Sequence, residues 1–280
     1  MFFSVIIPTC ERLEHLETCL AATLKSLGQL NQIDYEIIVS DDGSSTLAND
    51  LIANKFPGVL WLKGPRNGAA SNRNNGAMQA KGDWLLFVDD DCIPDLNWAK
   101  AYYEAIEQYP EINVFEGRTY PDRPRQSLAE EAPVNETGGH LWSCNFAIKR
   151  EFFLRVGKFE ERLRYDVEDT EFQYRLKNIF QASIQFIPSA SVCHPWRISK
   201  GWVRYEKMIE SRVLFYSMYP DKLRSITVYK YLKIVLGKII FTTIPGLFKY
   251  QMRGFWPDVN HTLFFAKLYL KILILNYSTR

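Results

Sequence analysis

The chain has 280 residues, of which 47% are hydrophobic and 24% charged, with 15 glycines and 13 prolines. This composition is close to that of an average folded protein and excludes a collagen-like chain, a coiled coil and a wholly disordered chain. The net charge of +2 hides an asymmetry, because residues 1–196 hold 19 basic and 28 acidic side chains, whereas residues 197–280 hold 15 basic and 4 acidic ones. This contrast predicts a change of role near Trp196, with an anionic surface as the partner of the basic segment.

The first residues and the cysteines indicate a cytoplasmic protein. No basic segment precedes the first apolar run, which ends at Pro8, so we expect neither a secretory signal nor a membrane anchor there. The five cysteines are scattered and form no CxxC pair, which predicts neither a disulfide framework nor a zinc site. We therefore expect a reducing, cytoplasmic environment.

Strands and helices are expected to alternate along the first 110 residues. Apolar runs bounded by turn residues predict four strands, over residues 3–7, 35–40, 59–62 and 84–88. Leucines spaced three or four residues apart predict a helix that ends near Gly28, and a second helix is expected over 69–80. The alternation predicts an α/β fold with a mainly parallel, Rossmann-like sheet flanked by helices.

The pattern loosens over residues 110–139, where three prolines interrupt a polar stretch. We expect a mobile connection or lid there, with one short strand over 114–119. Regular structure returns with a strand predicted over 141–149, an amphipathic helix over 167–177 and a strand over 183–187. These elements are expected to complete the α/β domain.

Five aspartates follow two of the predicted strands. Asp41 and Asp42 follow the second strand, and Asp89, Asp90 and Asp91 follow the fourth. In an open parallel sheet the ligand cleft lies outside the carboxyl ends of the strands, so these acids are expected to face one crevice. Their repulsion requires a positive partner, and hard oxygen ligands suit Mg²⁺ or Mn²⁺ bound to phosphate oxygens. A single aspartate after a strand is more often a turn or cap residue, but for the run of three we favour the cation site.

Five motifs occur in a defined order along residues 3–196. They are Ser4-Val5-Ile6-Ile7-Pro8-Thr9, Ser40-Asp41-Asp42-Gly43-Ser44-Ser45, the pair Arg66-Asn67-Gly68 and Ser71-Asn72-Arg73-Asn74-Asn75-Gly76, then Asp89-Asp90-Asp91 and Glu168-Asp169. In this order they resemble the motifs of the family 2 inverting glycosyltransferases, which have the GT-A fold. The resemblance implies transfer of a sugar, with inversion and a divalent cation, from a nucleotide-diphosphate donor to a hydroxyl of a glycan or lipid-linked acceptor. UDP is the default nucleotide.

The resemblance also divides the chain and assigns residues to the donor and the cation. It implies a catalytic domain over 1–196, with a nucleotide-sugar half over 1–110 and an acceptor half over 111–196, followed by a helical extension over 197–280. The implied donor-binding residues are Pro8, Thr9, Glu11, Asp41, Asp42, Arg73, Asp89 and Asp90. Asp91 would ligate the cation, and Asp89 would contact the cation or the ribose. An ion pair on a helix surface is the alternative for Arg73.

His194 follows the last predicted strand and is implied as a third ligand of the cation. An imidazole ligand would favour Mn²⁺ over Mg²⁺. The alternative is a structural hydrogen bond, the commoner role of a lone histidine.

The implied catalytic base is Asp169, which would remove the proton of the acceptor hydroxyl as its oxygen attacks the anomeric carbon. Glu168 would orient Asp169 or bind the acceptor. The alternative is that acids simply gather in the first turn of a helix, where its dipole favours them. Trp142 would offer a flat apolar surface to an acceptor sugar, with burial in the core as its alternative.

Two stretches of the basic segment combine apolar residues with lysines. In the stretch over 226–250, Lys230, Lys233 and Lys238 fall on one arc of a helix, which is typical of a basic helix lying on an anionic membrane. The lysines and a proline argue against a membrane span, and residues 262–275 repeat the arrangement. The alternative is that both helices pack on the catalytic domain or form the surface of a homo-oligomer. No nucleic-acid partner is expected.

Two other functions are compatible with part of this pattern. A sugar-phosphate nucleotidyltransferase would use similar acids, but it should carry a basic, glycine-rich loop after the first strand, which residues 8–12 lack. A glycosyltransferase-like protein that binds sugar or nucleotide without turnover is the second alternative. The presence of both Asp91 and Asp169 argues against it.

Overall fold

A computed structural model of the chain describes residues 1–30, 33–198 and 201–278. The chain forms two compact units. The first consists of Met1–Asp122, Pro133–Arg164 and Glu168–Pro195, and the second of Arg123–Ala132, Tyr165–Val167 and Trp196–Arg280. Two short segments that precede residue 196 therefore belong to the second unit. The predicted roles of the two parts of the chain stay predictions.

The first unit is built on a sheet of eight strands. Their order is β3 (Val59–Lys63), β2 (Asp34–Asp41), β1 (Phe2–Thr9), β4 (Trp84–Val88), β8 (Asn145–Lys149), β6 (Val114–Pro121), β9 (Ile184–His194) and β5 (Ile93–Pro94). Strands β3, β2, β1 and β4 are parallel, as are β6 and β9, whereas β8 runs antiparallel to both of its neighbours and β5 runs antiparallel to β9. The predicted α/β class with a mainly parallel sheet is confirmed.

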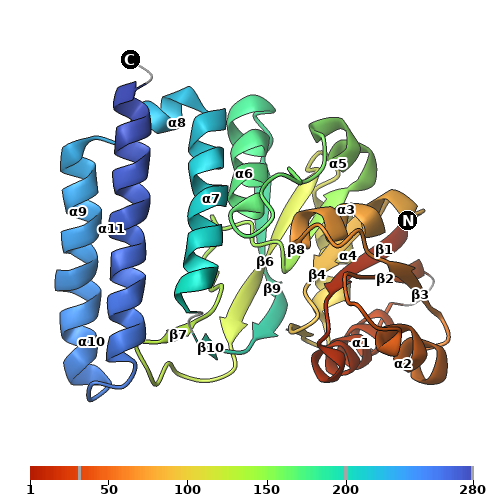
Figure 1. The fold of residues 1–280 in the computed structure, drawn as a ribbon. Helices are drawn as coiled ribbons and strands as arrows, with labels where there is room; N and C mark the ends of the chain where they lie inside the picture. The colour runs from red at the N-terminus through yellow and green to blue at the C-terminus, as the bar shows by residue number, and fades with distance from the viewer. Residues whose placement is uncertain (31–32, 199–200, 279–280) are drawn as a thin grey trace. The chain divides into compact units, whose positions relative to one another are not determined.

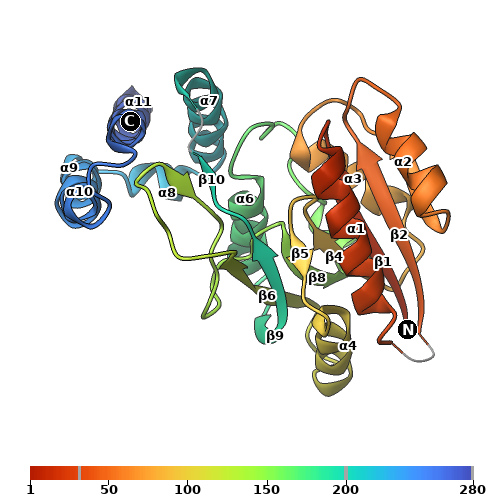
Figure 2. The same cartoon turned by 90° about the horizontal axis from the view of Figure 1, so that it is seen from below.

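Helices cover both faces of this sheet (Figures 1 and 2). One buried cluster lies under α1 (Leu13–Leu27), α2 (Leu47–Lys55) and α4 (Trp98–Gln108), and the other under α3 (Ala69–Gln79), α5 (Arg150–Val156) and α6 (Glu168–Tyr174). Alternate residues of a strand point to opposite faces, so Val5 and Ile7 of β1 join the first cluster and Ile6 joins the second. Strands buried on both faces explain the continuous apolar runs in the sequence.

Three predicted elements of the first unit have different bounds in the structure. The strand expected over 141–149 begins at Asn145, because Asn145 N–H bonds to Trp142 O and closes a turn. The helix expected over 167–177 is α-helical to Tyr174 and continues as the π-helical turn η1 (Arg175–Ile179). The strand expected over 183–187 extends to His194, because a register shift against β6 accommodates the proline within β9 as a bulge.

The second unit is mainly helical, with one small β-ribbon. It contains α7 (Trp202–Met218), α8 (Pro220–Arg224), α9 (Val228–Lys238), the π-helical turn η2 (Ile239–Thr243), α10 (Ile244–Lys249) and α11 (Phe255–Ser278), and β7 (Glu130–Glu131) pairs with β10 (Arg197–Ile198). Eight buried residues from α7, α8, α11 and the α8–α9 connection form its core, which includes Tyr205, Ile209, Phe264 and Ile272. The helix from α9 to α10 runs antiparallel to α11 (Figure 1).

The predicted cationic arc of the stretch over 226–250 is wrong for Lys238. Its Nζ lies 2.6 Å from Asp258 Oδ1, and the two side chains are only 11% and 2% exposed. Lys230 and Lys233 are exposed as expected. Lys238 turns inward because Asp258, placed at the start of α11, would otherwise be buried without a positive partner.

Candidate active site

The carboxyl ends of β1, β2 and β4 bring the first, second and fourth of the predicted motifs to one edge of the sheet. β1 and β2 pair in register, so that Thr9 lies opposite Asp41. The residues after β4 lie beside them, since Thr9 Oγ1 donates a hydrogen bond of 2.7 Å to Asp90 Oδ2. Asp41, Asp90 and Asp91 are 3%, 0% and 4% exposed, so three of the five predicted acids are held inside the protein.

Two acids predicted to bind the donor make hydrogen bonds at the ends of β1 and β2, and one of them, Glu11, ties the two loops together. Asp41 accepts hydrogen bonds from Gly43 N–H at 2.8 Å and from the Trp61 indole at 3.4 Å. Glu11 accepts a 2.5 Å bond from the Ser44 hydroxyl, which lowers the pKa of Glu11. Pro8 is buried in β1, where it pairs with Ser40 of β2.

Asp42 lies in the same loop and has a different environment. Its Oδ1 accepts a bond from Arg66 N–H at 2.9 Å. Burial nevertheless raises the pKa of Asp42, because the cost of removing charge from water exceeds the effect of that bond. The Asp42 carboxylate is therefore already partly desolvated, and it can accept a hydrogen bond from a hydroxyl group of a ligand.

Two arginines supply the positive charge that the aspartates require. Arg12 lies 2.5 Å from Asp90 Oδ1 and 3.0 Å from Asp91 Oδ2. Arg73 bridges Asp89 Oδ1 at 2.6 Å and Glu168 Oε1 at 2.9 Å. Arg73 is only 3% exposed, so it is not the surface arginine of the alternative interpretation.

Arg73 links the aspartate run to the late acidic pair. Burial alone would lower the pKa of Arg73, but the charges of Asp89, Glu168 and Asp169 raise it above its usual value. Asp169 therefore lies within electrostatic range of the same guanidinium. Two motifs about 80 residues apart in the sequence thus meet at one side chain.

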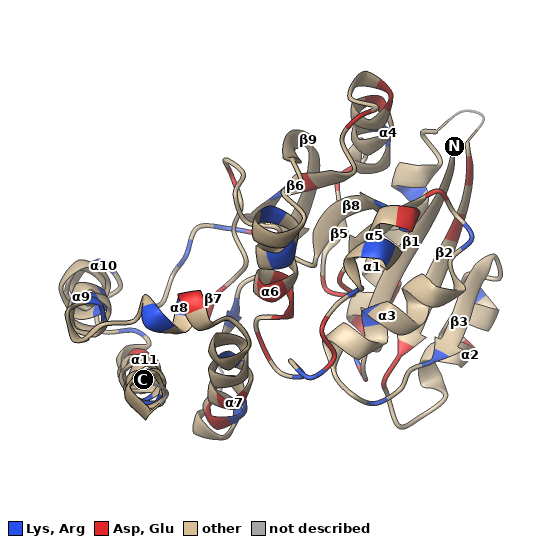
Figure 3. Cartoon of the chain, turned by 90° about the horizontal axis from the view of Figure 1, so that it is seen from above, with Lys and Arg blue, Asp and Glu red and all other residues tan. Residues whose placement is uncertain are grey.

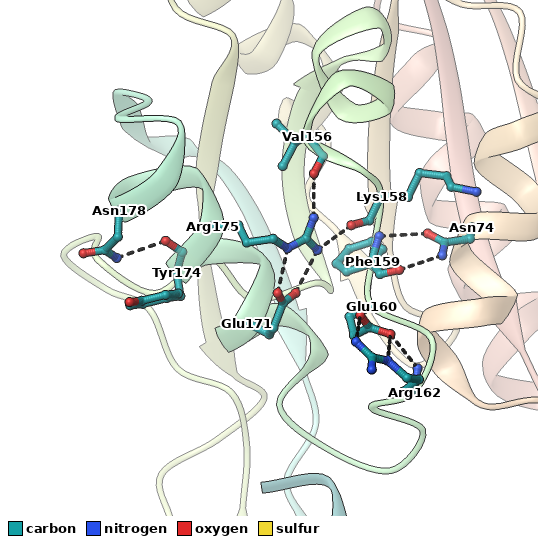
Figure 4. Close-up of polar contacts among 10 residues, drawn as sticks. All are labelled: Asn74, Val156, Lys158, Phe159, Glu160, Arg162, Glu171, Tyr174, Arg175 and Asn178. Atoms are coloured by element: carbon teal, nitrogen blue, oxygen red, sulfur yellow. Dashed lines mark hydrogen bonds and ion pairs between the residues drawn. The ribbon is translucent and has the colours of Figure 1, made fainter. Parts of the chain in front are cut away.

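The acidic pair begins α6, and several contacts fix this helix to the chain before it (Figure 4). Arg175 makes two bonds to Glu171, of 2.6 and 2.8 Å, and donates to Val156 O and Lys158 O. Asn74 of α3 makes two bonds to the backbone of Phe159. The helix that carries Arg73 and the helix that carries Glu168 and Asp169 are therefore anchored to the same stretch of chain.

Asp91, Cys92 and His194 form a buried group of potential metal ligands. One ligating atom from each lies within 4.8 Å of the other two. His194 Nδ1 lies 2.8 Å from Pro195 O, and since a carbonyl oxygen only accepts, Nδ1 carries the proton. The unprotonated Nε2 then faces Asp91 Oδ1 at 3.6 Å. Burial lowers the pKa of His194, which keeps the imidazole neutral.

This arrangement fits a divalent cation. Two acceptor atoms that face each other inside a protein are stabilised by a positive ion between them, and a mixed oxygen and nitrogen set suits Mn²⁺. Burial raises the pKa of Cys92, so its thiol stays protonated and is a poor ligand for a hard cation. Asp89, the other predicted ligand, contacts Arg73 and is outside this group among the described residues. Its role at the cation stays a prediction.

Trp142 has contacts that suit either of its predicted roles. It is half-buried, packs against the larger core cluster and stacks on His140 with ring centroids 5.5 Å apart. Its indole N–H donates to Val134 O at 3.1 Å. The position of Trp142 at the acceptor therefore stays a prediction.

The sequence prediction assigned no role to two polar residues of this site. Arg12 neutralises Asp90 and Asp91, and Asn72 donates to Thr9 O and Ser40 O at 3.1 and 2.8 Å, which ties β1 to β2. Arg12 lies three residues after the end of β1, where a lone arginine belongs to no motif that would single it out in the sequence. Asn72 lies in a helix rich in asparagine, where no single position stands out.

Comparisons with known proteins agree with this geometry. The model of Glycosyl transferase family 2 matches residues 4–157. An uncharacterized glycosyltransferase of Haemophilus influenzae is 34% identical over 187 residues, which are 62% of this chain and 61% of that protein. A GalNAc(5)-diNAcBac-PP-undecaprenol beta-1,3-glucosyltransferase of Campylobacter jejuni is 37% identical over 97 residues, or 31% of this chain and 29% of that protein. The matches thus span less than two thirds of these relatives.

Among solved structures, that of S. aureus TarS 1-349 in complex with UDP-GlcNAc resembles this chain with a TM-score of 0.60. The sequence identity is 20%, and the match covers 88% of this chain and 75% of that one. At this identity the likeness concerns the fold alone.

Proposed function

Because the chain belongs to glycosyl transferase family 2 and has its GT-A fold, we propose that it transfers a sugar from a nucleotide-diphosphate donor to an acceptor hydroxyl with inversion. The observation that supports this best is the position of Arg73. This buried side chain contacts Asp89, from the run predicted to meet the donor, and Glu168, from the pair predicted to meet the acceptor. Donor and acceptor groups must lie together for a single displacement.

A divalent cation, Mn²⁺ or Mg²⁺, would be held by Asp91 and His194, with Asp89 beside it. When bound, it would supply positive charge next to the departing diphosphate. The imidazole of His194 favours Mn²⁺. Arg12 balances the charge of Asp90 and Asp91, which prevents these carboxylates from repelling the diphosphate.

Asp169 is proposed as the base. Its carboxylate takes the proton of the acceptor hydroxyl while the acceptor oxygen bonds to the anomeric carbon from the face opposite the diphosphate. The bond from the anomeric carbon to the phosphate oxygen breaks in the same step, and the nucleotide diphosphate leaves with the electron pair. Glu168, held by Arg73 at 2.9 Å, orients the acceptor or Asp169.

For the donor we propose a UDP-sugar, bound by Pro8, Thr9, Glu11, Asp41, Asp42 and Asp90. A protein of similar fold has been solved with UDP-GlcNAc, which supports this choice. For the acceptor we propose a glycan or a lipid-linked sugar near Trp142, since the name of the Campylobacter relative contains PP-undecaprenol. We place the enzyme in the cytoplasm, at the inner face of a membrane.

The direct test is a set of UDP-, GDP- and dTDP-sugars incubated with the full chain and either Mn²⁺ or EDTA. We expect release of nucleotide diphosphate from one sugar nucleotide with Mn²⁺ and none with EDTA. Formation of a sugar nucleotide from a nucleoside triphosphate and a sugar phosphate would instead favour a nucleotidyltransferase. Binding of a donor with no turnover, even with a broad set of acceptors, would favour the non-catalytic alternative.

A further inference from the structure

The helix from α9 to α10 presents a large apolar surface to solvent. Among the described residues, Val228–Lys249 is the one helix long and apolar enough to cross a membrane, yet only 11% of its most apolar window is buried. Tyr229, Phe241 and Phe248 are 75%, 79% and 81% exposed, and Leu236, Ile240 and Ile244, which lie between them in the sequence, are 50%, 50% and 45% exposed. We call these six residues the outer face. A helix that is apolar on all sides is normally buried in a protein core or in lipid.

Positive charge lies at both ends of the outer face and not in its middle. Lys238, the central lysine, is paired with Asp258, which also accepts a bond of 2.6 Å from the Thr243 hydroxyl. Lys230 and Lys233 are exposed near the beginning of the helix, and Lys249 is exposed at its end. Figure 3, which looks along these helices, shows basic but no acidic residues on α9 and α10, as expected from a stretch without aspartate or glutamate.

We propose that the outer face rests in the surface of a bilayer that contains anionic phospholipids, with the helix parallel to the membrane plane. The apolar side chains would reach about 5–10 Å into the boundary between headgroups and acyl chains. The terminal lysines would contact the phosphates. This inference extends the membrane location proposed above, but it concerns binding alone and does not depend on sugar transfer.

The arrangement of α7 argues against a helix that crosses the membrane. α7 packs along α11, as shown by the rings of Tyr205 and Phe264, whose centroids are 4.9 Å apart, and by the ion pair between Glu206 and Lys267. If the α9–α11 hairpin spanned a bilayer, α7 would enter the hydrocarbon with its charged residues, which include Lys207 and Glu210. Charged side chains at that depth are costly. An orientation parallel to the membrane leaves α7 on the side away from the lipid.

The charge of the outer face also favours lipid over a second copy of the chain. Residues 222–257 contain no aspartate or glutamate. Two outer faces packed together would therefore bring lysines near lysines in either relative direction, with no acid to compensate. An anionic leaflet complements the same lysines, each at about 1 kcal/mol when close to the surface.

Flotation of the full chain with lipid vesicles tests the proposal without donor or acceptor. We expect the chain to float with phosphatidylcholine vesicles that contain phosphatidylglycerol, and less with phosphatidylcholine alone. The variant Phe241→Asp/Phe248→Asp should bind these vesicles about a hundredfold more weakly, or more weakly still, because each of the two side chains removed from lipid lowers the affinity roughly tenfold. Both side chains are mostly exposed, at 79% and 81%, so circular dichroism should show an unchanged fold.

A matched control is Leu47→Asp, which changes an apolar residue of the first unit that is 55% exposed. It should float like the unchanged chain. Equal flotation of the unchanged chain and the Phe241/Phe248 variant would overturn the proposal. The proposal would also be overturned if the unchanged chain does not bind vesicles and light scattering shows it to be a dimer, while the Phe241/Phe248 variant is a monomer. Neither result would affect the sugar-nucleotide test, so the two proposals can fail separately.

The orientation has a test of its own. In a Phe241→Trp variant, the new indole lies near the middle of the helix. An orientation parallel to the membrane predicts stronger quenching by lipids brominated close to the glycerol backbone than by lipids brominated near the chain end. Stronger quenching by the deeper bromines would indicate a span and would overturn the parallel orientation.

Discussion

Arg73 shows how one buried cation can organise a site made mostly of acids. Its guanidinium binds Asp89 and Glu168 through different nitrogens, which a lysine cannot reproduce because its ammonium is a single point charge. Sequence patterns predicted the two acidic motifs and placed Arg73 near the donor. They could not show that Arg73 joins the motifs, because that contact depends on the packing of α3 against the chain before α6.

We expect Arg73→Met to destabilise the protein by about 3–5 kcal/mol, because it removes a buried charge and leaves two partly buried carboxylates without their charged partner. Chemical denaturation followed by circular dichroism measures this. Arg162→Met is the control, since Arg162 is 64% exposed and pairs with Glu160 at the surface. It should change stability by less than about 0.5 kcal/mol. Equal stability of the Arg73 variant and the unchanged chain would show that the carboxylates find another partner.

The role of Asp169 can be separated from donor binding. We expect Asp169→Asn to bind the nucleotide sugar with unchanged affinity and to lower the rate of transfer roughly 10²–10⁴-fold, because an amide cannot take the acceptor proton. Calorimetry with the donor and a steady-state transfer assay measure the two effects. Glu160→Gln, at an acid paired with Arg162, serves as the control. Transfer at the native rate by Asp169→Asn would mean that another residue is the base.

Arg12 marks the limit of what could be predicted at this scale. The run Asp89–Asp91 stood out because three like charges in sequence need compensation. The compensating residue is distant in the sequence, and a lone arginine after a strand has no periodicity or motif to distinguish it. Its role follows only from the distances of 2.5 and 3.0 Å to Asp90 and Asp91.

At the level of elements, the strands were the most predictable part. Strands β1 to β4 are apolar runs followed by clear turn residues, and their predicted positions agree with the structure to within one or two residues. The helix α4 was not predicted, although Trp98, Tyr102 and Ile106 follow a spacing of four residues. α7 lies within the helical extension predicted over 197–280, but its own bounds were not predicted, because its apolar residues alternate with charged ones such as Glu206, which pairs with Lys267 of α11.

The contact between α3 and the sheet gives a sharp test of packing. A Cβ atom added to Gly76 would lie 2.8 Å from Cγ2 of Ile6 in β1, inside a fully packed core. We therefore expect Gly76→Ala to destabilise the protein by about 1–3 kcal/mol. Its melting temperature should fall by several degrees.

Gly58→Ala is the matched control for this change, because a Cβ there meets no atom within 4 Å. It should leave the melting temperature close to that of the unchanged chain. A Gly76→Ala protein that melts at the native temperature would mean that α3 can move away from β1 without cost, and that the position of Arg73 is less rigid than the structure indicates.

For the whole molecule, the distribution of charge was the most informative property of the sequence. It separated an acidic part, which contains the GT-A sheet, from a basic helical part. It could not show that residues 123–132 and 165–167 belong to the second unit, because these short segments join it only through contacts made in the folded state. Nor could it show that Lys238 faces inward, because helical spacing alone places Lys238 on the arc, whereas its pairing with Asp258 depends on how α9 packs against α11.

Binding of Mn²⁺, measured by electron paramagnetic resonance on the full chain in the presence of UDP, tests the cation site on which the proposed reaction depends. We expect Asp91→Asn and His194→Gln to weaken binding by about tenfold or more, as loss of a ligand should do. Glu136→Gln, at an exposed acid paired with Arg118, should bind like the unchanged chain. Native Mn²⁺ affinity in both the Asp91 and His194 variants would contradict the assignment of this site.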